Sequence, residues 1–134
     1  CPPIFESLKS ELGPRLRHWG YISSRCDYLA ALATSDVALS TALHEFQGLA
    51  ILEAAACGAV PLVPDDLAYR EIWPEEWRYS GETLVAKMRD RIRHVDRWRR
   101  IDPRPVANRF GWHALRARWA QLFEDPRPTT RRGI

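Results

Sequence analysis

Apolar positions along the chain follow two spacings, and together they predict short strands alternating with helices. A spacing of three and four positions, typical of helices, recurs in residues 4–12, 25–34, 47–57, 82–100 and 113–123. Short runs typical of strands occupy residues 15–21, 37–40, 60–64 and 77–79. This alternation predicts an α/β fold with a parallel sheet, in which ligands bind beyond the carboxyl ends of the strands.

Glycines mark both ends of the apolar helix predicted at residues 47–57. Gly48 opens the helix directly after the loop that follows the strand at residues 37–40, and Gly58 suits its left-handed C-terminal position. A strand, loop, glycine and helix in this order point free backbone N–H groups at an anion. Gly48 is either a packing glycine or the point where the N–H groups of Gln47, Gly48 and Leu49 approach a phosphate.

Two glutamates, Glu45 and Glu53, lie on either side of this turn, eight positions apart. A lone glutamate is usually solvated, and Glu45 would also suit a helix N-terminus. Glu53, however, stands in an apolar helix, where an unpaired carboxylate is costly, so we expect a ligand or a buried partner for it. Two carboxylates that hold hydroxyl groups beside a phosphate-binding helix end predict a nucleotide-sugar site.

Composition restricts the class of protein. The 134 residues are 46% hydrophobic and 28% charged, which fits one folded domain with an ordinary core. No apolar run approaches the roughly 20 residues of a membrane span, so we expect no membrane association. The start at Cys1, without an initiator methionine, predicts a piece of a longer protein. The three scattered cysteines lack metal-ligand spacing and predict reduced thiols in a cytoplasmic protein.

Charge is unevenly distributed between the two parts of the chain. Residues 1–76 carry 5 basic and 11 acidic side chains, whereas residues 77–134 carry 15 basic and 6 acidic ones. A phosphate-rich partner of the C-terminal part would explain this excess. A solvated helix face explains it equally simply and is the interpretation we favour, since most charge runs are solvated faces.

Other candidate residues carry weaker signals. His44 is either a ligand contact or an ordinary loop histidine. Asp65 and Asp66 invite a metal interpretation, but adjacent carboxylates in a loop flanked by proline are more often turn and cap residues. Neither a nucleophile motif nor a metal site emerges, and we expect no cofactor.

The block from Asp36 to Val63 resembles the donor domain of retaining GT-B glycosyltransferases of family 4. The shared features are Glu45 and Glu53 with seven residues between them, a helix of small residues, and a strand that starts at Pro61. Further segments resemble tRNA-queuosine mannosyltransferases, and these are His18–Tyr21, Ser40–Ala42, His44–Phe46, Pro61–Pro64 and Leu67–Ile72. The likeness covers residues 2–80 well and residues 81–123 only in pattern.

The resemblance implies GDP-mannose as donor, a queuosine-modified tRNA as acceptor, and a retaining mannosyltransferase that needs no metal. It assigns Glu45 to the donor-sugar hydroxyls, where the transfer takes place, and Glu53 to the ribose hydroxyls. The backbone from Phe46 to Leu49 would bind sugar and diphosphate, and His44 would be a further donor contact.

The same resemblance implies that residues 1–134 are a partial C-terminal, nucleotide-sugar-binding domain: a truncated Rossmann-like parallel sheet flanked by helices. The N-terminal acceptor domain and the first donor-domain strands would be absent, so we expect the fragment alone to be inactive. In the doubly wound order the strand at residues 16–19 would be the third and that at residues 37–40 the fourth. The alternative is a noncatalytic nucleotide- or RNA-binding module, in which Trp98 and Trp112 would stack on bases.

Overall fold

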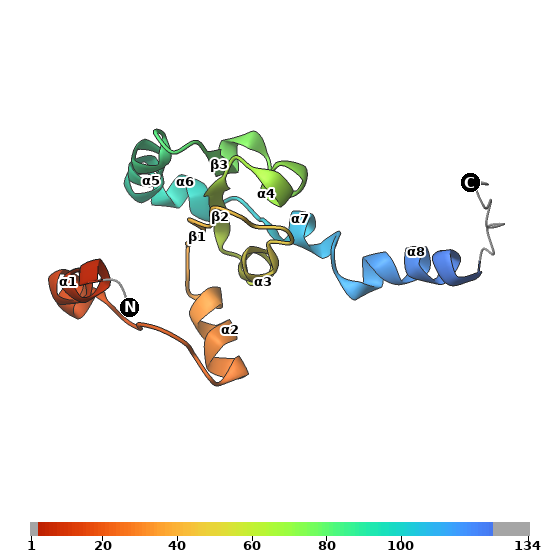
Figure 1. Ribbon diagram of the computed structural model, residues 1–134, viewed down its shortest axis with the longest axis horizontal. Coiled ribbons are helices and arrows are strands. Elements are labelled where there is room, and N and C mark those ends of the chain that lie inside the picture. Colours follow the sequence, from red (N-terminus) through yellow and green to blue (C-terminus); the bar gives the residue numbers. More distant parts are fainter. Residues whose placement is uncertain (1–2, 125–134) are drawn as a thin grey trace, which may run out of the picture.

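A three-stranded parallel sheet with helices on both sides forms the centre of the computed structural model, which describes residues 3–124 (Figure 1). The strands are β1 (Val37–Leu39), β2 (Val60–Pro64) and β3 (Arg78–Tyr79), in the order β1-β2-β3. The helices are α1 (Pro3–Leu12), α2 (Arg25–Ala33), α3 (Leu49–Ala56), α4 (Leu67–Ile72), α5 (Leu84–Arg93), α6 (Val95–Arg99), α7 (Arg104–Asn108) and α8 (Trp112–Glu124), with 3₁₀ turns at Gly13–Arg15 and Glu75–Trp77. The α/β class, a truncated Rossmann-like parallel sheet flanked by helices, is confirmed.

Strand β2 is the central strand although it contains Pro61. Val60 donates its N–H to Asp36, and the carbonyl of Leu62 accepts from Ser40, so alternate residues of β2 bond to the β1 side. The backbone nitrogen of Pro61 therefore points toward β3, and β3 pairs with β2 only from Val63 onward. The missing N–H of proline removes no bond of the ladder, which explains how a central strand tolerates it.

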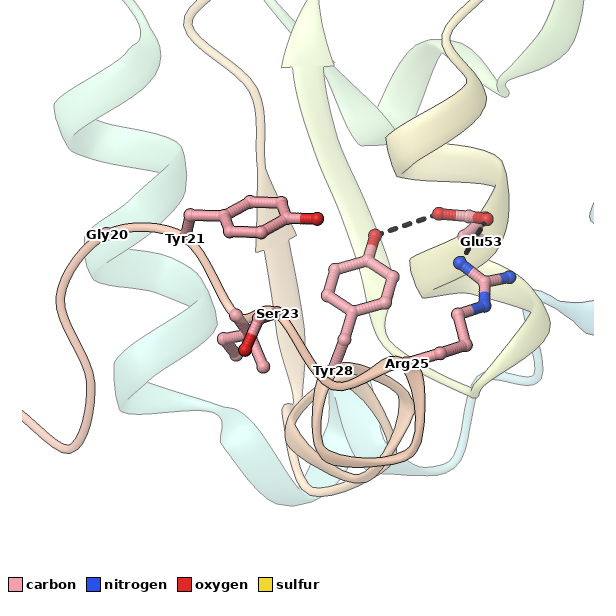
Figure 2. A pocket seen from close by; sticks show the side chains of 7 residues that line it. Gly20, Tyr21, Ser23, Arg25, Tyr28 and Glu53 are labelled. Atoms are coloured by element: carbon pink, nitrogen blue, oxygen red, sulfur yellow. Dashed lines mark hydrogen bonds and ion pairs between the residues drawn. The ribbon is translucent and has the colours of Figure 1, made fainter.

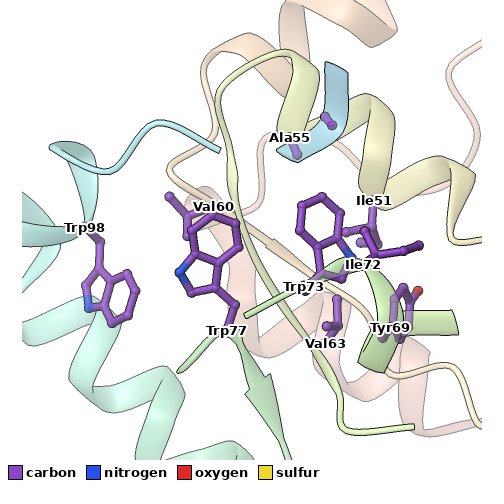
Figure 3. Packing of buried hydrophobic residues seen from close by; sticks show 10 residues of the cluster. Ile51, Ala55, Val60, Val63, Tyr69, Ile72, Trp73, Trp77 and Trp98 are labelled. Carbon is purple, nitrogen blue, oxygen red and sulfur yellow. The ribbon is translucent and has the colours of Figure 1, made fainter. Parts of the chain in front are cut away.

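The core lies between the sheet and the helices and is rich in aromatic rings (Figure 3). Leu62 and Val63 of β2 are fully buried. Ile51 and Ala55 of α3 pack on one side of the strands, and Trp98 of α6 lies on the other. The buried members of this cluster are Ile51, Ala55, Val60, Val63, Tyr69, Ile72, Trp73, Trp77, Trp98 and Ala107.

Capping residues set the starts of three helices, and α3 begins at Leu49 rather than at the predicted residue 47. The hydroxyl of Ser24 accepts the N–H of Asp27 at the start of α2. Asp66 caps α4 through the N–H of Leu67, as expected for a cap rather than a metal ligand. Gly48 is the N-cap of α3 with φ +68°, a left-handed conformation that favours glycine.

Two predicted elements are wrong. Residues 15–21 form a 3₁₀ turn and an extended segment without strand pairing, because no neighbouring strand offers backbone partners among the described residues. The single helix predicted at residues 82–100 is two helices that meet at His94, whose φ of −117° is not helical. The buried side of α5 also differs from the predicted apolar stripe, because Arg91 is buried while Ile92 is 69% exposed.

The terminal helices α1 and α8 lie apart from the sheet on opposite sides in Figure 1. On α8, the predicted helix at residues 113–123 is confirmed, but most of its apolar face is exposed. Short α7, which the sequence analysis did not predict, packs on α3. In residues 3–124 no helix has the length and apolar character needed to cross a membrane.

Candidate functional site

The loop from Ser40 to Gly48 leaves the carboxyl end of β1, and two buried tyrosines fix its beginning. Tyr69 donates its hydroxyl hydrogen to the Ser40 hydroxyl at 3.0 Å, and Tyr79 donates to the Ser40 carbonyl at 2.8 Å. Burial raises the pKa of both tyrosines, so both remain protonated donors at neutral pH. The loop therefore starts from a fixed point at the edge of the sheet where ligands bind parallel α/β folds.

Glu45 folds back on the start of α3. Its Oε1 atom accepts the N–H of Gly48 at 2.9 Å and the N–H of Gln47 at 3.1 Å. These two bonds, the Gly48 bond first, hold the pKa of the Glu45 carboxyl below its ordinary value. Two of the three N–H groups predicted to face a phosphate thus bind a carboxylate of the chain itself. The N–H groups of Leu49 and Ala50, in the first turn of α3, have no partner within the helix and remain for an anion.

Glu53 projects from α3 toward α2 and is held at both carboxylate oxygens (Figure 2). Tyr28 donates to Oε2 at 2.9 Å, and the Arg25 guanidinium lies 2.9 Å from Oε1. These hydrogen bonds, that of Arg25 first, lower the pKa of Glu53. The Glu53 side chain is 38% exposed, so each oxygen retains access to a further donor.

Two cavities meet at Glu53. The first, of about 490 Å³, lies between α2 and α3 and is lined by Gly20, Tyr21, Ile22, Ser23, Arg25, Tyr28 and Glu53 (Figure 2). The second, of about 810 Å³, is more apolar and runs along α3 toward α7. Among its lining residues are Phe46, Gln47, Leu49 and Glu53. A molecule with a polar and an apolar part would therefore pass beside Glu53.

The other predicted site residues are spread over the loop. His44 is exposed, and Phe46, 79% exposed, projects into solvent at the larger cavity. Neither Glu45 nor His44 lines either of the two cavities described above. Within residues 3–124 no three His, Cys, Asp or Glu side chains are grouped to hold a metal ion.

Sequence reasoning did not find Arg25 and Tyr28 as partners of Glu53. Neither residue belongs to a motif in the sequence. The signal that would find them is the cost of an unpaired carboxylate in an apolar helix, which requires a nearby cation or donor. Their place opposite Glu53 depends on how α2 packs against α3, and no spacing within α2 reveals that packing.

The lowered pKa values of Glu45 and Glu53 predict how stability changes with pH. A carboxyl whose pKa is lower in the folded state stabilises that state fully above its unfolded pKa, about 4.3 for glutamate. We expect the free energy of unfolding to fall as the pH decreases from that value through the lower folded pKa values. Urea unfolding measured at several pH values tests this. In the variant Glu53→Gln the decrease should be shallower, and an unchanged slope would contradict the assignment.

Gly48→Ala is expected to destabilise the chain by about 1–2 kcal/mol, since a left-handed conformation costs other residues roughly that much. The new Cβ would also lie 3.0 Å from Cε1 of Tyr69, so the ring that anchors Ser40 must shift. Gly81→Ala is the matched control, because a Cβ there meets no atom within 4 Å. Urea denaturation of both variants measures the difference, and equal stabilities would count against strain at Gly48.

Comparisons with known proteins show that this chain is similar to mannosyltransferases, a class of glycosyltransferase. This confirms the resemblance to mannosyltransferases that the sequence showed. One of them is the tRNA-queuosine alpha-mannosyltransferase of Drosophila melanogaster, 43% identical over 86 residues, which are 64% of this chain and 22% of that protein. Another is a GDP-mannose-dependent alpha-(1-6)-phosphatidylinositol dimannoside mannosyltransferase of Mycobacterium tuberculosis, 34% identical over 105 residues, 73% of this chain and 27% of that protein.

The chain thus spans about a quarter of the length of these relatives. No protein-family model matches the chain, and no solved structure matches it significantly. The names of both relatives are those of mannosyltransferases.

Proposed function

We propose that this chain is a partial C-terminal donor domain of a retaining GT-B glycosyltransferase of family 4. Its donor would be GDP-mannose and its acceptor a queuosine-modified tRNA. The observation that carries the proposal is the start of α3, where free amides lie between Glu45 and Glu53 in a chain similar to mannosyltransferases. The names of the relatives support this donor and acceptor, since one includes GDP-mannose and the other tRNA-queuosine.

Glu53 would accept hydrogen bonds from the ribose hydroxyls. With the ribose at Glu53, the positions of the base and of the diphosphate follow. A base attached to that ribose must enter a cavity that Glu53 lines. The cavity between α2 and α3 suits a base because Tyr21, 88% exposed, and Tyr28 offer aromatic faces there. The diphosphate would then bind the N–H groups of Leu49 and Ala50, and the sugar hydroxyls would bind Glu45.

The chemistry of this arrangement is departure of a nucleoside diphosphate. The bond from the anomeric carbon to the diphosphate oxygen breaks, and its electron pair leaves with the diphosphate. The N-terminus of α3 stabilises that charge through its free N–H groups and its dipole. A hydroxyl of the acceptor bonds to the anomeric carbon on the same face and passes its proton to the departing diphosphate. Attack on that face retains the configuration of the anomeric carbon.

The alternative is a noncatalytic nucleotide- or RNA-binding module. Trp112 is 68% exposed and remains accessible for stacking, but the predicted role of Trp98 is wrong, since that ring is only 6% exposed and belongs to the core. Stacking on bases requires a free face. The donor-domain proposal is therefore better supported.

Calorimetric titration with GDP-mannose, GDP, UDP and ADP tests the proposal. We expect GDP and GDP-mannose to bind with similar affinities, and UDP and ADP to bind more weakly. Absence of nucleotide binding, together with salt-sensitive RNA binding that Glu53→Ala leaves unchanged, would favour the RNA-binding alternative.

We further propose that an N-terminal domain of the same protein, together with the first strands of the donor domain, completes the enzyme. Under this proposal, residues 1–134 alone should not transfer mannose, because no acceptor domain orients the tRNA hydroxyl. Incubation with radiolabelled GDP-mannose and queuosine-containing tRNA measures this directly. Robust turnover by the isolated chain would contradict the proposal that transfer needs the N-terminal domain.

A further inference from the structure

Arg91 on α5 is a buried charged side chain that the proposed donor site does not use. It is 1% exposed and packs on an aromatic ring of the core, with its guanidinium carbon 3.9 Å from the ring centroid of Trp98. None of its three side-chain nitrogens has a hydrogen-bond partner among the described residues. A buried guanidinium without acceptors is strongly unfavourable, so this group calls for an anion.

Two carboxylates, Asp90 and Glu76, act on the charge of Arg91 from a distance, but neither forms a hydrogen bond with the guanidinium. The ring of Trp98 covers one face of the guanidinium, but a ring face cannot accept the five N–H groups in the guanidinium plane. Asp90 uses one oxygen for His94, at 2.8 Å, and the other for the indole N–H of Trp98, at 3.1 Å. Burial lowers the pKa of Arg91 to about 10, so the side chain keeps its charge at neutral pH.

A cavity of about 400 Å³ adjoins this guanidinium. Its lining residues are Glu76, Ala86, Lys87, Asp90, Arg91, Arg97 and Trp98. Lys87 is fixed there by its bonds to the carbonyls of Glu75 and Arg78, and the exposed Arg97 lies over the same indole as Arg91. Three cations and two carboxylates thus line the cavity, and of these Lys87 and Asp90 are already engaged with other groups of the chain.

We propose that this cavity binds a phosphate group, with Arg91 as its main ligand and Arg97 as a second. The planar guanidinium fork matches the geometry of phosphate oxygens, and a low-dielectric wall of indole strengthens the contact. The phosphate can be free inorganic phosphate or a phosphodiester of RNA. Three further arginines of this region, Arg89, Arg93 and Arg100, are exposed and have no ion pair within residues 3–124, which favours a polyanion.

This site is separate from the proposed donor site. Figure 1 shows α5 and α6 on one side of the sheet and α3 on the other, and the cavities at Glu53 share no residue with the cavity at Arg91. The proposal therefore does not depend on nucleotide-sugar binding.

Thermal unfolding in phosphate and in chloride of equal ionic strength tests the site. Phosphate stabilises most proteins by exclusion from their surface, so Arg91→Met supplies the baseline. We expect phosphate to raise the melting temperature of the wild-type chain more than that of Arg91→Met. The rise in melting temperature, called the phosphate gain below, should be intermediate in Arg97→Gln. Arg17→Gln, which replaces an exposed arginine outside the cavity and outside α5 and α6, should behave as wild type.

An equal gain in the wild type and both cavity variants would overturn the proposal. Should Arg91→Met not fold, the exposed Arg97→Gln gives the same comparison, and a full phosphate gain in it overturns the proposal.

A second measurement identifies the source of the phosphate. Fluorescence anisotropy with a single-stranded RNA oligonucleotide should show about tenfold weaker binding by Arg91→Met if the site takes a phosphodiester, as for loss of one charge-assisted contact. Unchanged RNA affinity, with the phosphate gain lost, assigns the site to the free anion. GDP titration distinguishes this site from the donor site, since Arg91→Met should leave GDP affinity unchanged and Glu53→Ala should leave the phosphate gain unchanged.

Discussion

Replacing Glu53 by alanine is expected to weaken binding of GDP about 100-fold. Two ribose hydroxyls donating to one carboxylate amount to about 3 kcal/mol, and each 1.4 kcal/mol changes the dissociation constant tenfold. The geometry supports so large an effect, because Tyr28 and Arg25 hold both oxygens of Glu53 in place before a ligand arrives. Such preorganisation removes the cost of ordering the side chain during binding. Calorimetric titration of both chains with GDP measures the change.

Three variants control this experiment. Tyr28→Phe keeps the carboxylate but removes one of its donors, so we expect a smaller loss, of about tenfold or less. Glu82→Ala removes an exposed carboxylate outside both cavities at Glu53 and should bind GDP as wild type does. Arg25→Ala leaves Glu53 with Tyr28 alone and should resemble Tyr28→Phe. Equal affinity of Glu53→Ala and wild type would remove Glu53 from the donor site.

Patterns that depend on local chemistry could be predicted from the sequence. The strand at β1, the glycine at the start of α3, the proline in β2 and the cap at Asp66 all follow from conformational preferences of single residues. The order of strands and helices then fixes the parallel sheet. The same local reasoning placed the loop from Ser40 to Gly48 at the carboxyl end of β1, where the structure has it.

Features that depend on partners distant in the sequence could not be predicted in this way. Residues 15–21 alternate like a strand, but a strand also needs a neighbour, and the described chain provides none. The break at His94 and the burial of Arg91 go together with the position of Trp98 of α6, which lies in the core and under the Arg91 guanidinium. The spacing of apolar residues contains no information about that packing, and it would put Ile92 on the buried side, where the structure has Arg91.

The two carboxylates of the candidate site illustrate the same distinction. That Glu53 needs a partner followed from its apolar helix, but the identity of the partners, Arg25 and Tyr28, depends on the packing of α2 on α3. That amides at the start of α3 would bind an anion was also predicted, and the structure adds that Glu45 itself bonds to two of them. A diphosphate is therefore left with the N–H groups of the first turn of the helix.

Tyr69→Ala is expected to have the largest effect on stability, about 3–5 kcal/mol, as for other buried aromatic residues replaced by alanine. Tyr69 is 2% exposed and packs in the central cluster, so its loss leaves a cavity beside β2. Its ring also forms the surface against which Gly48 packs, at 3.0 Å from an added Cβ. Because the free energy of unfolding of a domain is typically about 5–15 kcal/mol, this substitution would remove a large part of it. Urea denaturation of both chains, fitted with one common dependence of the free energy of unfolding on urea concentration, gives the difference in stability.

Tyr69→Phe separates the ring from the hydroxyl. It keeps the packing but removes the bond to Ser40, so we expect a loss of only about 1 kcal/mol. Its effect should instead fall on the donor site, since the loop that carries Glu45 begins at Ser40 and would retain only the Tyr79 bond there. A weaker affinity for GDP-mannose with nearly unchanged stability is the expected result. If Tyr69→Phe were as unstable as Tyr69→Ala, the hydrogen bond rather than the packed ring would be the main contribution of Tyr69 to the fold.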